Sequence, residues 1–66
     1  MKEFLNQNCY IAVDVRGRIF YYMRAAVTEV TDTHITFEDT LKDNEPHCFR
    51  IADIIEIKLS TKEAKK

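Results

Sequence analysis

Apolar and polar positions alternate with a period of two along several short stretches of this chain, which is the pattern of half-buried β-strands. The stretch Cys9–Val15 places three branched aliphatic side chains on one face: Ile11, Val13 and Val15. Arg16 and Gly17 follow, and Gly17 is the only glycine of the chain. Because glycine adopts positive φ without steric cost, this dipeptide predicts a tight turn between two strands.

The longest stretch rich in aliphatic, aromatic and β-branched residues is Arg18–Phe37, which contains no Gly or Pro. It predicts a long strand, a polar turn at Thr31–Thr33 and a returning strand at His34–Glu38. After Ala25 and Ala26, the apolar spacing changes from two residues to three. Such a slip predicts a β-bulge that bends the strand, and a long bent strand can serve both halves of a small barrel.

The remaining pattern completes five strands. Asp39–Pro46 is a polar loop, and His47–Ile51 is a strand with Phe49 and Ile51 inward. A helical turn at 52–54 leads to the last strand, whose inward residues are Ile55, Ile57 and Leu59. Met1–Asn8 supplies a short N-terminal helical turn. We therefore expect an all-β, five-stranded, strongly bent small barrel in one domain, residues 1–59, followed by a charged, disordered tail, residues 60–66.

The composition fits a small soluble domain. The chain has 66 residues, of which 45% are hydrophobic and 32% charged. It has no apolar run near the roughly 20 residues that cross a bilayer, and its start does not have the pattern of a signal peptide. We expect a cytoplasmic protein with no membrane contact, in which Cys9 and Cys48 remain thiols.

The net charge of −1 is unevenly distributed, with +2 over residues 1–24, −5 over 25–59 and +2 over 60–66. Domains that mainly bind phosphate backbones are usually basic overall, which argues against strong non-specific nucleic-acid binding but leaves a local site open. The acidic middle segment also suggests a decoy that competes for a nucleic-acid-binding partner.

Three segments carry a resemblance to a known family: VDVRGRIFYYM, AVTEVTDTHITF and CFRIADIIEIKLS. Their order resembles that of SH3-like small barrels, and most closely the Sm-like proteins, including the bacterial Hfq type. The resemblance implies ring assembly and, more weakly, RNA binding. The chain lacks the family's glycine midway along the long strand, where Ala25 or Ala26 would substitute. The segments Thr31–His34 and Arg50–Asp53 do not clearly match the family's RNA-contacting residues.

The most informative candidate site combines aromatic and arginine side chains that we expect on one face of the first hairpin. Such a combination can stack bases and hold phosphates, and tyrosine and arginine are also enriched at protein interfaces. The structural alternative, which we favour, is that Phe20 and Tyr22 cover the second side of a barrel strand or a subunit contact. The candidate binding residues are Tyr10, Arg16, Arg18, Phe20, Tyr22 and Arg24.

Catalytic and metal chemistry have little support. The four potential metal ligands, Cys9, His34, His47 and Cys48, lack the short paired spacing of zinc sites. His47 and Cys48 are adjacent, so a strand turns them to opposite faces, and a barrel of this size offers little cleft. We expect no enzyme activity, no metal and no cofactor.

The sequence thus predicts a binding module with two main alternatives. The first is a self-assembling, Sm-like RNA-binding or regulatory protein. The second is a protein-interaction or structural module, SH3- or Tudor-like, that uses its aromatic face. Open edge strands favour a homo-oligomer, with RNA or another protein as a further partner.

Overall fold

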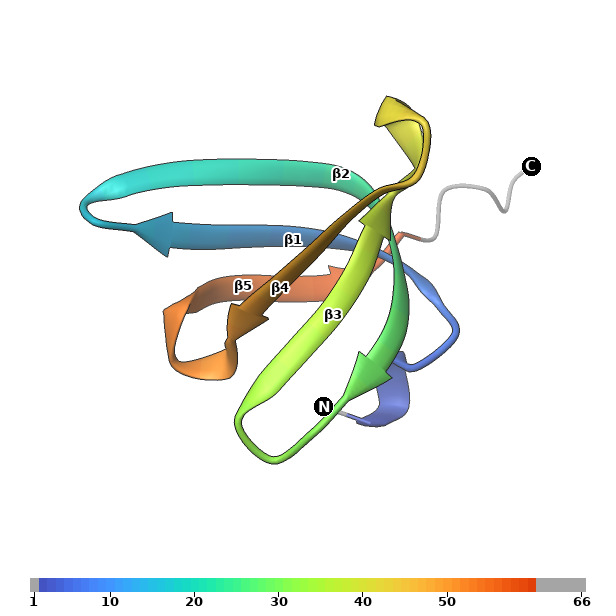
Figure 1. Ribbon diagram of the computed structural model, residues 1–66, viewed down its shortest axis with the longest axis horizontal. Helices are drawn as coiled ribbons and strands as arrows, with labels where there is room; N and C mark the ends of the chain where they lie inside the picture. Colours follow the sequence, from blue (N-terminus) through green and yellow to red (C-terminus); the bar gives the residue numbers. More distant parts are fainter. Residues whose placement is uncertain (1, 61–66) are drawn as a thin grey trace.

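The computed structural model describes residues 2–60 and contains one antiparallel sheet of five strands in the order β4-β3-β2-β1-β5 (Figure 1). The all-β prediction is therefore confirmed, and the helices are single 3₁₀ turns. In chain order, the elements are η1 (Lys2–Phe4), β1 (Asn8–Val15), β2 (Arg18–Val30), β3 (His34–Asp39), η2 (Thr40–Lys42), β4 (Glu45–Arg50), η3 (Ile51–Asp53) and β5 (Ile54–Leu59).

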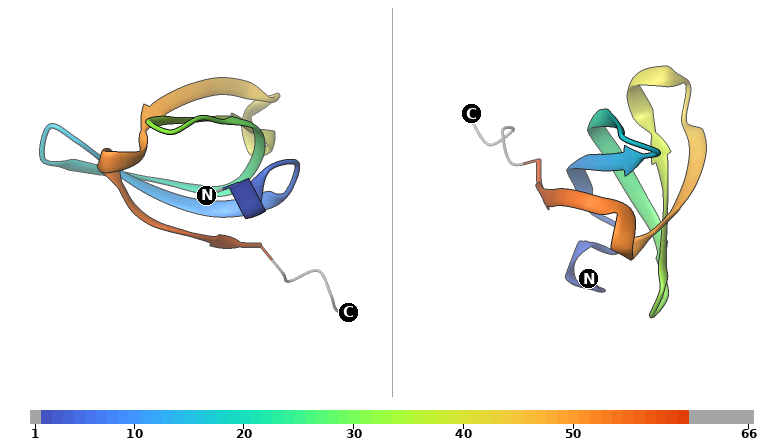
Figure 2. Two further views of the ribbon diagram at one scale, coloured as in Figure 1. Left: turned by 90° about the horizontal axis from the view of Figure 1, so that it is seen from below. Right: turned by 90° about the vertical axis from the view of Figure 1, so that its left-hand side faces the viewer.

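Strand β2 joins the two halves of the sheet. Its first part, Arg18–Ala26, pairs with β1, and its last part, Ala25–Val30, pairs with β3. The β2–β3 register shifts between Val27 and Glu29, within the region where the change in apolar spacing predicts a bulge. The sheet curls at this strand, so the β3–β4 half lies across from the β1–β5 half (Figure 2).

The core lies inside the curl. Its fully buried members come from the first three strands: Cys9, Ile11, Val13, Ala25, Val27, Ile35 and Phe37. Residues of the other elements pack against them, including Phe4 of η1, Phe49 of β4 and Ile57 of β5. Burial of Ile11, Val13, Ile35 and Phe37 follows the predicted alternation.

The β1–β2 hairpin closes at a two-residue turn, as Gly17 predicts. Arg16 and Gly17 have φ values of 55° and 82°, and the Asp14 carboxylate accepts a hydrogen bond of 2.9 Å from the Gly17 amide. Both residues at the centre of the turn have positive φ, which matches the right-handed twist of the strands they connect. The turn sets Val15 opposite Arg18. The paired ends of β1 and β2 on either side of this turn extend away from the rest of the sheet, and we call them the arm (Figure 1).

Two boundary predictions are wrong. Pro46 belongs to β4, paired with Glu38, and not to a loop. A strand accepts proline here because β4 is at the sheet edge, where the missing amide donor can face outward. Asp39 also does not belong to the predicted loop, because it is the last residue of β3 and caps the η2 turn that follows.

The predicted inward face of β5 is wrong at two of three positions. Ile55 is 53% exposed and Leu59 is 46% exposed, whereas Ile57 packs against the core. The β1–β5 register shifts between Ala12 and Val13, so that Ile54 enters the core and Ile55 is the extra residue of the irregularity.

No helix among residues 2–60 is long and apolar enough to cross a membrane. The predicted C-terminal tail lies outside the described residues except for Ser60, whose amide donates a 2.9 Å hydrogen bond to the Asn8 carbonyl.

Candidate interaction surface on the outer face of the sheet

The hairpin register decides which side chains of β2 face the core. Ile11 lies opposite Tyr22 and Val13 opposite Phe20, and directly opposed residues in an antiparallel pair point to the same side. Because Ile11 and Val13 are fully buried, Phe20 and Tyr22 lie on the core side of the sheet. These two aromatic members of the predicted binding face therefore do not lie on the outer face of the hairpin.

Tyr22 is part of an aromatic cluster. Its ring centroid lies 5.0 Å from that of Phe37, 4.9 Å from that of His47 and 6.0 Å from that of Phe49. These separations are typical of favourable aromatic pairs. Tyr22 therefore packs against the interior, and it does not cover a second, outer side of the strand as the structural alternative expected.

The outer face of the arm carries the side chains of β2 that alternate with Phe20 and Tyr22, namely Ile19, Tyr21 and Met23. Ile19 is 47% exposed, Tyr21 61% and Met23 57%. The Tyr21 ring stacks on Tyr10 of β1, with centroids 6.4 Å apart and planes 23° from parallel. Three large side chains exposed at alternate positions of one strand form a continuous apolar row, which is a feature of interaction surfaces.

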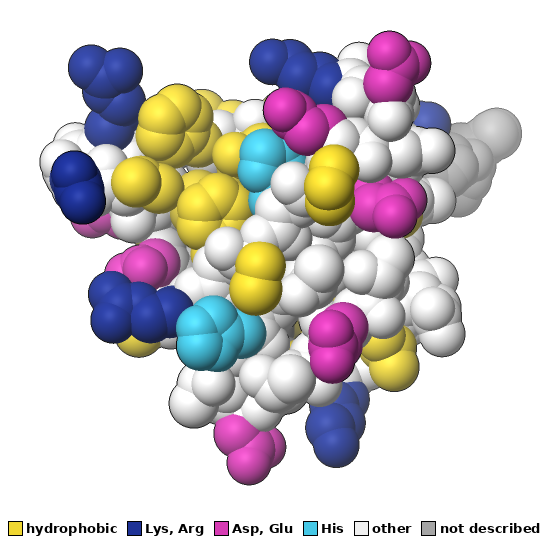
Figure 3. Space-filling model, in the orientation of Figure 1, with side chains coloured by type: hydrophobic (Ala, Val, Ile, Leu, Met, Phe, Trp, Pro, Cys, Tyr) yellow, Lys and Arg dark blue, Asp and Glu magenta, His cyan; other side chains and the backbone are white. Residues whose placement is uncertain are grey.

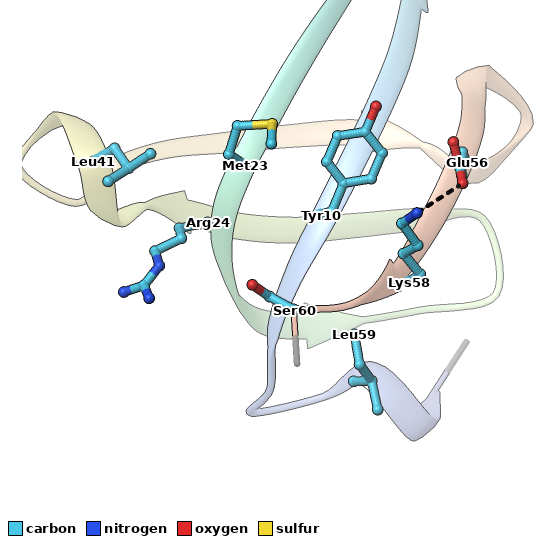
Figure 4. A pocket seen from close by; sticks show the side chains of 8 residues that line it. All are labelled: Tyr10, Met23, Arg24, Leu41, Glu56, Lys58, Leu59 and Ser60. Carbon is cyan, nitrogen blue, oxygen red and sulfur yellow. Dashed lines mark ion pairs between the residues drawn. The ribbon is translucent and has the colours of Figure 1, made fainter. Parts of the chain in front are cut away.

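A groove of about 520 Å³ continues this face toward β5. Figure 4 shows Tyr10 of β1 between Met23 of β2 and Lys58 of β5, with Leu41 of η2 beyond Met23. The remaining residues that line the groove are Arg24, Glu56, Leu59 and Ser60. The lining therefore combines four apolar or aromatic side chains with charged groups at its sides.

The charges of the groove are not equivalent. Lys58 Nζ lies 3.6 Å from a Glu56 carboxylate oxygen and 5.3 Å from the Tyr10 ring centroid, so it is already balanced by an acid. Arg24 forms no ion pair with any residue of the 2–60 segment, and its guanidinium points away from Tyr10 (Figure 4). Of the two cationic side chains in the part of the groove lining that the structure describes, Arg24 is thus the one available for an acidic ligand group.

The short η2 turn positions Leu41. Asp39 caps the turn, since its carboxylate accepts a 3.1 Å hydrogen bond from the Leu41 amide. The Thr40 hydroxyl donates a 3.0 Å hydrogen bond to the Arg24 carbonyl, which fastens η2 to β2. These two bonds hold an exposed leucine beside Met23.

A second hollow, of about 280 Å³, lies on the core side of the arm and is lined by Phe20, Tyr21, Tyr22, Asp39, Lys42, Glu45 and His47. On this face, hydrophobic side chains of the arm lie beside a histidine, with acidic side chains next to it and basic ones at the far tip (Figure 3). Burial, and then the charges of Asp39 and Glu45, raise the pKa of Tyr22. Two carboxylates, those of Asp39 and Glu45, thus line the hollow against one ammonium group, that of Lys42.

The six predicted binding residues do not share one face. Tyr10 and Arg24 line the outer groove, whereas Phe20 and Tyr22 line the hollow on the opposite side. Arg16 and Arg18 are exposed at the tip of the arm. The structure thus brings together two pairs of the predicted residues and separates these pairs from each other.

The binding residues predicted from the sequence do not include the exposed row of the outer face, Ile19, Tyr21 and Met23. The signal was present, because a two-residue turn at Arg16 and Gly17 fixes the register and therefore the parity of β2 relative to the buried residues of β1. Leu41 had no such signal, because it lies in a segment with a loop-like composition.

No group of three His, Cys, Asp or Glu side chains within residues 2–60 could hold a metal ion. The two thiols are separate, with Cys9 buried and Cys48 exposed, and burial raises the pKa of Cys9, which keeps it protonated and unreactive.

Comparisons of the chain with protein-family models, with curated proteins and with solved structures each found no match.

Proposed function

We propose that this chain is a non-enzymatic protein-interaction module whose outer groove binds a short segment of a partner protein. The observation that carries the proposal is the exposed row of Ile19, Tyr21 and Met23 leading into the groove. Aliphatic and methionine side chains predominate there, and such surfaces adapt to apolar side chains of a partner. The chemistry that fits is an aliphatic or aromatic residue near an acidic one, which would pair with Arg24.

The fold-level part of this proposal is an SH3-like small barrel of Sm-like type. Three observations support it: the strand order β4-β3-β2-β1-β5, the sharing of β2 by both halves of the sheet, and the single turn η3 between β4 and β5. In this proposal the sheet curls far enough for Phe49 of β4 and Ile54 of β5 to close a single hydrophobic core.

RNA binding is the second candidate, and one observation favours it. Tyr10 and Tyr21 stack on each other at an exposed sheet surface, with Lys58 over the Tyr10 ring. Exposed aromatic rings with nearby cations can stack the bases of single strands. We rank this candidate second, because most of the groove's apolar side chains are not aromatic and Lys58 is paired with Glu56.

A peptide selection tests the proposal directly. A random peptide library would be selected on the immobilised protein, and the affinity of the enriched peptides would be measured for wild type and for Met23→Glu. We expect enriched peptides with an apolar and an acidic residue, and a loss of affinity of roughly tenfold or more in Met23→Glu, because one buried apolar side chain contributes about 1.5–3 kcal/mol.

The matched control is Ile55→Glu, since Ile55 is 53% exposed, like Met23 at 57%, but does not line the groove. Peptides that bind both variants as well as wild type would refute the proposed site. Binding of fluorescent oligo-A and oligo-U at low salt tests the RNA candidate in parallel. The RNA candidate would be favoured instead if this binding is lost in Tyr21→Ala and if no selected peptide depends on the groove.

A further inference from the structure

Among the described residues, one edge of the arm has no strand beside it. Within residues 2–60, β2 pairs with β3 only from Ala25, which lies opposite Asp39, so the stretch Arg18–Arg24 has a strand neighbour on one side only. Figure 1 shows this edge along the upper side of the arm. Unpaired backbone groups of an extended strand are a template for another strand. The edge is also long and uninterrupted by proline.

The outward backbone groups of this edge can be assigned. The two-residue turn pairs Val15 with Arg18, so the even positions of β2 near the turn form hydrogen bonds to β1. Ile19 and Tyr21 therefore turn their amide and carbonyl groups toward the free side. Both residues have exposed apolar side chains, 47% and 61% exposed, that another strand would cover.

The hollow beside this edge suits a cation. Phe20 and Tyr22 supply aromatic surface, and Asp39 and Glu45 supply negative charge. The His47 Nε2 atom is buried, lies 3.4 Å from a Glu45 oxygen and has no hydrogen-bond partner among residues 2–60. Guanidinium groups combine stacking on aromatic faces with hydrogen bonding to carboxylates, so arginine is the side chain that best fits this lining.

The chain itself carries the complementary charge. Segment 38–45 contains four carboxylates against one lysine, a net charge of −3, whereas the arm tip, residues 14–18, contains two arginines against one aspartate. Along the free edge, Arg18 of the tip lies on one side of Phe20, and Tyr22, which lines the hollow, lies on its other side. An edge with opposite charges at its two ends is complementary to its own antiparallel copy.

We propose that the free edge of β2 pairs with the same edge of a second copy, forming a twofold-symmetric antiparallel dimer. The axis passes beside Phe20, so that Ile19 of one copy pairs with Tyr21 of the other through their outward backbone groups. Arg18 of each copy then lies opposite Tyr22 of the other, with its guanidinium in the hollow beside Asp39 and Glu45. This contact goes beyond the proposed function: it shares Ile19 and Tyr21 with the exposed row, but it uses the strand edge and the hollow and none of the residues that line the groove.

The register follows from side-chain chemistry. Residues that lie opposite each other in two paired strands point to the same face of the sheet. The twofold axis between the two copies must therefore pass beside a single residue, and Tyr21 is the neighbouring alternative to Phe20. An axis at Tyr21 would set Arg18 opposite Arg24 of the second copy, and like charges directly opposite destabilise strand pairs. The axis at Phe20 sets Arg18 against the acidic hollow instead. The other titratable groups that line the hollow are those of Tyr21, Tyr22, Lys42 and His47.

Charge reversal tests the dimer. Sedimentation equilibrium of the wild-type protein should give a dimer whose dissociation constant rises with salt. Arg18→Glu and Glu45→Arg should each raise that constant by roughly tenfold, because each change makes two symmetric contacts repulsive. A mixture of the two variants should form heterodimers near wild-type affinity, since both contacts are then attractive. The control Lys2→Glu changes the net charge as Arg18→Glu does, on the exposed η1 turn, and should leave the dimer unchanged.

Three outcomes would overturn the proposal. The wild-type protein could remain a monomer, it could associate with equal strength in Arg18→Glu, or the two variants could fail to restore each other when mixed. Circular dichroism of each variant shows whether the sheet is retained. The double variant Arg18→Glu with Glu45→Arg in one chain adds a further check, since it should recover the homodimer.

Discussion

Replacing Tyr22 and Tyr21 in turn by alanine tests the face assignment of the arm. The two tyrosines are adjacent in sequence and identical in chemistry, so truncation removes the same atoms from each. They differ in their surroundings: Tyr22 lies on the core side among aromatic rings, and Tyr21 is 61% exposed on the outer side. A difference in the free energy of unfolding between the two variants therefore shows which of the two side chains faces the core.

The contacts indicate the size of the difference. Complete burial of a large aromatic makes its truncation to alanine cost about 3–5 kcal/mol, and Tyr22 is half-buried with three aromatic neighbours. We expect Tyr22→Ala to lower the free energy of unfolding by about 3 kcal/mol. Tyr21→Ala removes only the stack of this ring on Tyr10, so it should lower the free energy of unfolding by about 0.5–1 kcal/mol. Domains of this size have roughly 3–10 kcal/mol in total.

Urea denaturation followed by circular dichroism measures both changes in one series. Tyr22→Ala should unfold at a clearly lower urea concentration than wild type, or be largely unfolded without urea, while Tyr21→Ala stays close to wild type. Equal losses, or a larger loss in Tyr21→Ala, would refute the face assignment and with it the outer groove.

Three further outcomes follow from other parts of the structure. Asp39→Ala should lower the free energy of unfolding by about 1 kcal/mol in the same urea assay, because it removes the cap of η2, whereas Asp39→Asn should retain most of it; equal losses in the two would contradict the capping role. Arg16→Asn should stabilise the hairpin by about 0.5 kcal/mol, since asparagine tolerates positive φ better than arginine, and a lower melting temperature would contradict this. Finally, folding holds the pKa of Tyr22 above its unfolded value of about 10, so the folded state retains a proton that the unfolded state loses. That contribution is fully present below pH 10 and is lost as the pH rises through the folded-state pKa; Tyr22→Phe should show a smaller alkaline loss of stability than wild type, and an equal loss would exclude Tyr22 as its source.

The sequence was sufficient for the fold class because each strand alternates locally. Cys9–Val15 and His34–Glu38 predict buried positions that the structure confirms at Ile11, Val13, Ile35 and Phe37. The bend of β2 was also predictable, because the change in apolar spacing after Ala26 is a local signal of a register shift.

The remaining features depend on pairing between distant strands. The exposure of Ile55 arises from an irregularity between β1 and β5, which neither strand's own alternation specifies. The outer groove likewise combines residues of β1, β2, η2 and β5, and Leu41 reaches it only because Asp39 and Thr40 hold η2 against β2. The face of Tyr21 could have been derived from the hairpin register, but the groove required the three-dimensional arrangement.

The most direct test of the proposed interaction surface is the affinity of a library-selected peptide for wild type, Met23→Glu and Ile55→Glu, measured in parallel by fluorescence anisotropy. We expect a loss of affinity of roughly tenfold or more in Met23→Glu and unchanged affinity in Ile55→Glu. Wild-type affinity in Met23→Glu would contradict this expectation.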